Sequence, residues 1–111
     1  MKSFRGINGT LILKDDAVVI LLEKGIDGTF HKHPEIEIPY HNIQEVKVSL
    51  GGITNGYICI VNTDCNSPSN IFKAIKNDNT VIFRIFKNSS AEKFAKKLRS
   101  LILERNNNNE T

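Results

Sequence analysis

The sequence predicts a mainly β fold of about seven short antiparallel strands followed by a single C-terminal helix. From residue 10 to residue 86, β-branched runs alternate with clusters of Gly, Asn, Asp and Pro, a pattern typical of antiparallel sheets. After Ser89 the apolar residues recur every three or four positions, which is the period of one helix face. With 111 residues, 40% of them hydrophobic, the chain is expected to fold as one domain without a disulfide or a metal.

The first half of the chain contains four predicted strands. They cover residues 10–14, 17–23, 35–38 and 43–50. Asp15 and Asp16 form a two-residue connection that suits a hairpin between the first two strands. In the third strand glutamate alternates with isoleucine, which predicts that one face is buried and the other meets water.

The second half contains three predicted strands. Residues 57–61 are apolar at every position, as expected of a central strand that is covered on both faces. Residues 71–75 and 80–86 are predicted to form a hairpin across the polar residues 76–79.

The last segment predicts an amphipathic helix from about Ser89 to Glu104. Ser89 and Glu92 have the spacing of a capping box, which would place the helix start at Ser89. The apolar stripe is expected to pack on the sheet, because no second helix is predicted; it consists of Ala91, Phe94, Ala95, Leu98, Leu101 and Ile102. Residues 1–105 would form the domain, and residues 106–111, which begin with four asparagines, a disordered polar tail.

The predicted core takes the inward-facing residues of the strands together with the helix stripe. It comprises Leu11, Leu13, Val19, Leu21, Ile36, Ile38, Ile43, Val46, Ile58, Ile60, Val81, Phe83, Phe94, Leu98 and Leu101.

The cysteine content and the short apolar stretches favour a cytoplasmic protein. The net charge of +3 is only weak support for a polyanionic partner. Two cysteines are fewer than a small disulfide-stapled domain normally has, so two reduced thiols are expected. The longest apolar stretch, residues 17–22, is too short for a signal peptide or a membrane span.

No residue pattern predicts a catalytic, metal or cofactor site. His31, His33 and His41 do not combine with Cys59, Cys65 and Asp64 at a recognised metal-site spacing, so solvated loop histidines are expected. Cys59 lies in the most apolar strand and is interpreted as a small core residue, not as a nucleophile. The glycines do not form a phosphate-binding loop between a strand and a helix. We therefore expect a protein that is not an enzyme and has no cofactor.

Three short motifs carry a resemblance to a known family. They are Phe4-x-Gly6-x-Asn8-Gly9-Thr10, Ile38-Pro39-x-x-x-Ile43-x-x-Val46, and Gly56-Tyr57-Ile58 followed by Asn79-Thr80-Val81-Ile82-Phe83. Over residues 4–103 the chain resembles bacterial pleckstrin-homology-like domains of unknown function. The resemblance implies a barrel or sandwich of about seven antiparallel strands capped by the helix, and a binding or assembly scaffold for lipids, peptides or proteins.

The loops differ from those of the phosphoinositide-binding members of that superfold. Residues 14–16, 40–42 and 76–79 are expected at one open end, where a headgroup would require several cations. Two lysines, Lys14 and Lys76, stand there against Asp15, Asp16 and Asp78. A phosphoinositide ligand is therefore disfavoured.

Two hypotheses for function remain. The first is a noncatalytic interaction module that binds a protein or self-assembles through strand edges, with the off-stripe Leu103 as a candidate contact. The alternative is peripheral binding to an anionic membrane or to nucleic acid through a basic helix face, which is otherwise a solvated surface. That face contains Lys93, Lys96, Lys97 and Arg99. Because no aromatic residue is interleaved with these cations, nucleic acid is disfavoured.

Overall fold

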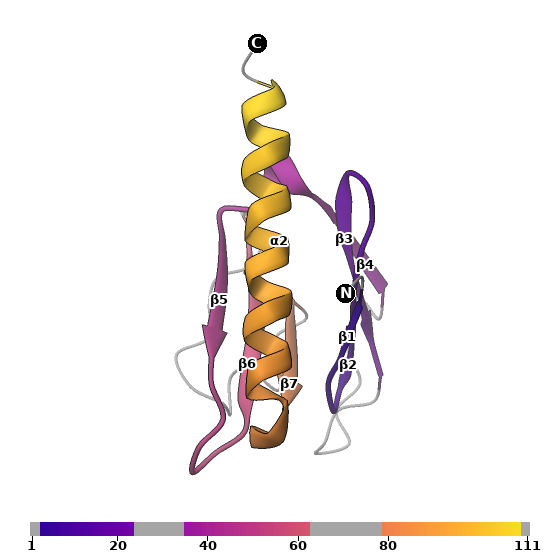
Figure 1. Cartoon of the computed structure of the whole chain (residues 1–111). Helices are drawn as coiled ribbons and strands as arrows, with labels where there is room; N and C mark the ends of the chain where they lie inside the picture. Colours follow the sequence, from indigo (N-terminus) through magenta and orange to yellow (C-terminus); the bar gives the residue numbers. More distant parts are fainter. Residues whose placement is uncertain (1–2, 24–34, 63–78, 110–111) are drawn as a thin grey trace.

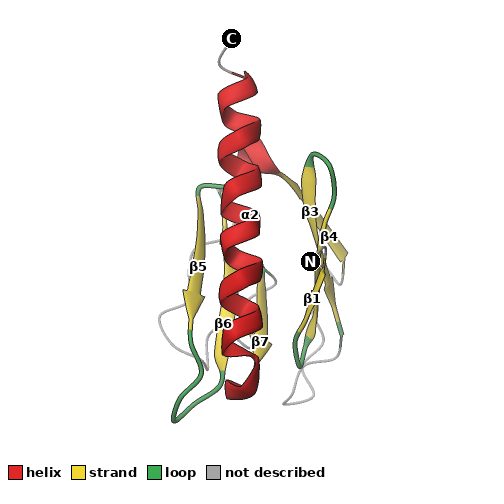
Figure 2. Cartoon of the chain, viewed as in Figure 1, coloured by secondary structure: helices red, strands yellow, loops and turns green. Residues whose placement is uncertain are grey.

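The computed structural model describes residues 3–23, 35–62 and 79–109 of the chain (Figure 1). Within these residues the fold is mainly β, with two antiparallel sheets and one C-terminal helix, as the sequence predicts (Figure 2). The four-stranded sheet has the order β1 (Ser3–Arg5), β2 (Gly9–Leu13), β3 (Ala17–Leu22) and β4 (Glu35–Pro39). The three-stranded sheet has the order β5 (Glu45–Ser49), β6 (Gly56–Val61) and β7 (Thr80–Phe83).

Short 3-10 turns make two of the connections. One turn, Tyr40–Asn42, joins the two sheets, and the other, Ile85–Lys87, leads from β7 directly into helix α2 (Asn88–Asn109). Helix α2 packs against the three-stranded sheet and extends beyond it (Figure 1). No helix in the described ranges combines the length and the apolar character needed to cross a membrane.

The strands differ from the predicted set at both ends of the β region. Strand β1 was not predicted, because three residues are too few to show a period. The predicted strand at residues 71–75 lies outside the described residues. The predicted strand 80–86 ends at Phe83, which pairs with Gly56, the first residue of β6, so the chain has no neighbour in β6 to pair with beyond that point.

Strand β6 occupies the centre of its sheet, as predicted, and all six of its residues are buried. Ile58 and Ile60 belong to the main core between the sheets and the helix. Residues of the opposite face form a second, smaller cluster, which consists of Tyr57, Cys59, Val61 and Ile82 with Ile7 packed against it.

The predicted core is largely confirmed, with one error of phase in β3. Ile36 and Leu101 are partly buried against the core, and the remaining predicted residues outside β3 are buried. In β3, however, the inward residues are Val18, Ile20 and Leu22, whereas Val19 and Leu21 were predicted. The error arises because every residue of this strand is apolar, so alternation cannot indicate which face is inside.

The segment between β1 and β2 ties the two sheets together. The Ile7 N–H donates to the Ile82 carbonyl at 2.6 Å, and the buried Asn8 side chain bonds the same strand twice. A Cβ at Gly6 would lie 2.2 Å from the Ile82 carbonyl oxygen, so the chain approaches β7 this closely only with glycine. The first motif of the sequence thus has a structural role.

Helix α2 uses the predicted apolar stripe but has different ends. It starts at Asn88, directly after the 3-10 turn, so Ser89 lies inside the first turn and the predicted capping box is wrong. The Asn88 side chain instead bonds both the N–H (2.7 Å) and the carbonyl (2.9 Å) of Gly51. The helix continues to Asn109 instead of Glu104, because each added residue extends an existing ladder of hydrogen bonds.

Candidate functional site

The chemistry-bearing residues noted in the sequence do not form a reactive cluster in the part of the chain that is described. His31, His33, Cys65 and Asp64 lie outside the described residues. His41 is exposed in the turn after β4, and Cys59 is buried in β6. Within the three described ranges, no group of three His, Cys, Asp or Glu residues could hold a metal ion.

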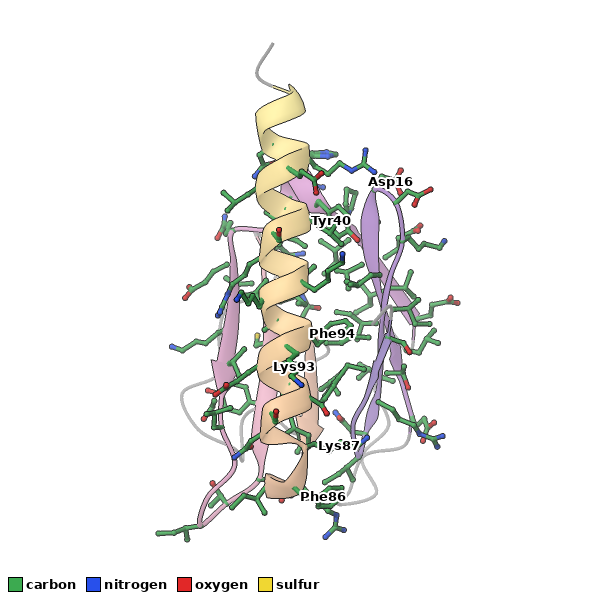
Figure 3. All side chains as sticks on the ribbon, in the orientation of Figure 1. Asp16, Tyr40, Phe86, Lys87, Lys93 and Phe94 are labelled. Carbon is green, nitrogen blue, oxygen red and sulfur yellow. The ribbon has the colours of Figure 1, made fainter. Side chains whose placement is uncertain are left out.

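The turns at residues 14–16 and 40–42 lie together at one end of the molecule, as expected. The Tyr40 N–H donates to the Asp16 carbonyl at 3.0 Å, and the Tyr40 hydroxyl donates to the Lys14 carbonyl at 2.5 Å (Figure 3). The Lys14 ammonium forms a 3.0 Å ion pair with Glu37, and the hydrogen bond that it donates to this carboxylate raises the pKa of Lys14. Because Lys14 is paired with Glu37, the turn at residues 14–16 keeps the negative charges of Asp15 and Asp16, and the positive charge of Arg105 also acts on Tyr40 at this end. Residues 76–78 lie outside the described residues.

The predicted basic helix face contains three solvated lysines and one arginine with a structural contact. Lys93, Lys96 and Lys97 are exposed, and Lys93 projects from the visible face of α2 in Figure 3. The Arg99 guanidinium instead donates to the Val46 carbonyl at 2.6 Å, which links α2 to β5. The bond to a carbonyl fixes the Arg99 side chain without neutralising its charge, so this face keeps four cations, three of them on lysines for which no structural contact is seen in the described part of the chain.

Among the described strands, β5 pairs only with β6, and its other side is here called the open edge. The Ile60 N–H donates to the Asn79 carbonyl, next to β7, and therefore points away from β5. Ile60 and Val46, which face each other across β6 and β5, are thus a pair without hydrogen bonds between them. By the same alternation, the backbone groups of Val46 and Val48 point away from β6.

A groove, here called the edge groove, runs between this open edge and α2. It consists of two hollows with Arg99 between them. The larger, of about 490 Å³, is lined by Val48, Leu50, Glu92, Ala95, Lys96 and Arg99. The smaller, of about 360 Å³, is lined by Ile43, Gln44, Glu45, Val46, Arg99, Ile102 and Leu103. Each hollow therefore has an apolar floor with charged residues beside it.

The sequence analysis named three residues of this groove as candidate contacts, Lys96, Arg99 and Leu103, but did not predict the groove itself. Leu103, predicted to lie off the apolar stripe, is 64% exposed and lines the smaller hollow. Helix α2 packs beside β5, although the two are about fifty residues apart in the sequence. The sequence could not indicate this contact, because it depends on how the sheets and the helix pack.

The chain matches no protein-family model, no curated protein and no solved structure in the three comparisons made. The case for function therefore depends on the geometry of the edge groove and its surroundings.

Proposed function

We propose that the chain is a noncatalytic interaction module of the pleckstrin-homology-like type, which binds an extended segment of another protein chain in the edge groove. The observation that supports this best is the open backbone edge of β5 beside two apolar hollows. A strand edge of this kind adds a further strand through main-chain hydrogen bonds. The two cysteines of the sequence make a cytoplasmic location part of the same proposal.

The hydrogen bonds offered to a bound segment follow from the orientation of β5. Arg99 already satisfies the Val46 carbonyl, so the open groups are the Val46 N–H and both backbone groups of Val48. A segment would therefore be held mainly at Val48.

The side chains of the segment would alternate between solvent and the groove, as in any added strand. Inward side chains would enter the hollow beside Leu50 and Ala95 or the hollow beside Ile102 and Leu103. Since both hollows are largely apolar, we expect aliphatic or aromatic residues at alternate positions of the segment.

Proline at position 48 provides the test. Val48→Pro removes one N–H that faces the groove, and it leaves the bonds between β5 and β6 intact because residue 48 does not bond β6. Val48→Ala is the matched control, since it trims the side chain and keeps the N–H. Linear peptides selected from a random display library on the wild-type protein should bind Val48→Ala and lose at least tenfold in affinity for Val48→Pro.

Light scattering tells whether the segment comes from a second copy. A mass above 12.5 kDa that returns to the monomer value in Val48→Pro identifies self-assembly through β5. Selected peptides that bind Val48→Pro as tightly as wild type contradict the proposal, and so does a monomeric protein that yields no binding peptide.

A further inference from the structure

The end of the molecule opposite the acidic turns presents four exposed apolar side chains. This surface, here called the apolar tip, consists of Leu50, Ile53, Ile85 and Phe86. Figure 3 shows Phe86 at this end and Asp16 at the other. Phe86 is 75% exposed, and large apolar groups grouped at one end of a small domain indicate a contact surface.

Two segments far apart in sequence build the apolar tip, and they are fixed to each other. The hairpin between β5 and β6 contributes Leu50 and Ile53, and the connection from β7 to α2 contributes the other two. The two hydrogen bonds between the Asn88 side chain and Gly51 hold these segments together. The four side chains therefore belong to one surface whose backbone is anchored.

Ile53 occupies the apex of a tight turn. The Gly52 N–H donates to the Thr54 carbonyl at 2.9 Å, and the side chain between them is fully exposed. Turn positions usually hold Gly, which has a permissive backbone, or Asn, Asp and Ser, whose side chains hydrogen-bond the backbone of the turn. An isoleucine at the apex projects an aliphatic group beyond the body of the protein.

Cations lie beside the apolar tip. Arg5, Arg84 and Lys87 line a hollow of about 180 Å³ together with Phe86, and none of its lining residues is acidic. The Lys87 ammonium is held in place by a 2.7 Å hydrogen bond to the Arg5 carbonyl. Neither arginine is in an ion pair with a described carboxylate.

The nearby carboxylates stand outside this hollow. Glu23 follows the end of β3, and Glu92 lies one turn along α2, where it lines the larger hollow of the edge groove. All the charged side chains that line the hollow are therefore positive.

We propose that the apolar tip docks on a membrane surface rich in anionic phospholipid, with Ile53 and Phe86 entering the interface and the three cations meeting headgroup phosphates. Apolar groups that project ahead of a cationic rim match the two layers of such a surface. A protein partner would require a complementary shape over a broad area, whereas the apex of a tight turn is narrow and convex. This activity goes beyond the proposed function, and the two surfaces share only Leu50.

The binding test uses sedimentation with vesicles made of phosphatidylglycerol and phosphatidylcholine in equal parts, against vesicles of phosphatidylcholine alone. We expect binding to the anionic vesicles only, weakening as salt is raised because the attraction is screened. Arg84→Glu should weaken binding about thirtyfold, since it reverses one charge at the surface. Phe86→Ser should weaken it at least about tenfold by removing an inserted apolar group.

Two surface variants on the helix serve as matched controls. Leu103→Ser removes an exposed apolar residue distant from the apolar tip, and Lys93→Glu reverses an exposed charge on α2; both should bind anionic vesicles nearly as wild type does. If Lys93→Glu abolishes binding while Phe86→Ser does not, the helix face is the docking surface and the proposal is wrong.

The absence of tryptophan from the sequence allows a direct readout of insertion. The emission of Ile53→Trp and of Phe86→Trp should shift to the blue with anionic vesicles and be quenched by brominated lipid. Leu103→Trp should show neither change. Lack of binding at low salt overturns the proposal, as does self-association through Phe86 without vesicle binding, which would identify a protein contact instead.

Discussion

Asn8 is the residue whose replacement gives the clearest test of how the two sheets are joined. It is buried, its side-chain N–H donates to the Thr80 carbonyl at 3.1 Å, and its side-chain oxygen accepts from the Ile82 N–H at 2.8 Å. Asn8→Ala would leave both backbone groups buried and unpaired, at a cost of about 1–3 kcal/mol each. We therefore expect the free energy of unfolding to fall by about 3 kcal/mol or more, from a total of about 5–15 kcal/mol.

A carboxyl at the same position adds a pH dependence of known sign. Asn8→Asp keeps the acceptor for Ile82, but an ionised oxygen would then face the Thr80 carbonyl. Burial raises the pKa of such a carboxyl, since it disfavours the charged form. The variant should therefore be closer to wild type in acid and lose stability as pH rises through that raised pKa.

Urea unfolding followed by far-ultraviolet circular dichroism measures both effects. Asn42→Ala, at an exposed asparagine of the turn after β4, is the control and should change the free energy of unfolding by less than about 0.5 kcal/mol. A loss below about 1 kcal/mol for Asn8→Ala, or a deficit of Asn8→Asp that does not change with pH, would refute this account of the sheet junction.

Three further predictions concern stability, measured in the same way. Gly6→Ala should destabilise the protein by about 2 kcal/mol or more because its Cβ would meet a β7 carbonyl, whereas Gly52→Ala, in open space, should stay within about 0.5 kcal/mol. Leu98→Asp should abolish the folded circular dichroism spectrum by burying an unpaired charge, and Lys97→Asp, at the exposed neighbour, should not. Tyr40→Phe should cost about 1 kcal/mol. Because burial raises the pKa of Tyr40, the wild-type protein should lose stability as pH rises past 10.0, and the variant should lose less.

Much of the fold could be predicted because, in several elements, the hydrophobic pattern of the sequence matches the faces that are buried in the structure. The continuous apolar run of β6 indicated a central strand, and the stripe around Phe94 and Leu98 indicated the buried face of α2. In β4 the alternation of glutamate with isoleucine correctly indicated the half-buried face.

The errors in the predicted strands occur where the local sequence is ambiguous or where a neighbouring strand determines the structure. In β3 either phase would bury apolar residues, so only packing against the second sheet selects Val18 and Ile20. Ile85 and Phe86 continue the apolar pattern of β7, yet they leave the sheet because β6 has no residue to pair with them. The same two residues then become part of the apolar tip.

The sequence indicated single residues of the edge groove but neither binding surface as a whole, because each surface combines segments that meet only in the fold. Val48 and Lys96 line one hollow, and Arg5 and Arg84 line another. In the basic helix cluster, which the sequence did indicate, Arg99 is tied to the Val46 carbonyl of β5. Charge counted along one helix therefore could not locate the cationic surface beside Phe86.

The edge groove lies between β5 and α2, and both elements also adjoin the apolar tip. The directions of β5 and α2 therefore determine how the edge groove would be oriented on a membrane. Strand β5 runs toward the tip and α2 runs away from it, so a docked protein would hold the edge groove roughly upright on the membrane and open to the side (Figure 1). The turn at Asp16 lies at the opposite end of β3 from the tip, about 20 Å away by the length of a six-residue strand, which is well beyond the screening length of about 8 Å at physiological salt. We therefore expect Val48→Pro to abolish peptide binding without changing vesicle binding, and Phe86→Ser to do the reverse, with both affinities measured on each variant. If either substitution abolishes both activities while the protein remains folded, the two surfaces are not independent and this orientation is wrong.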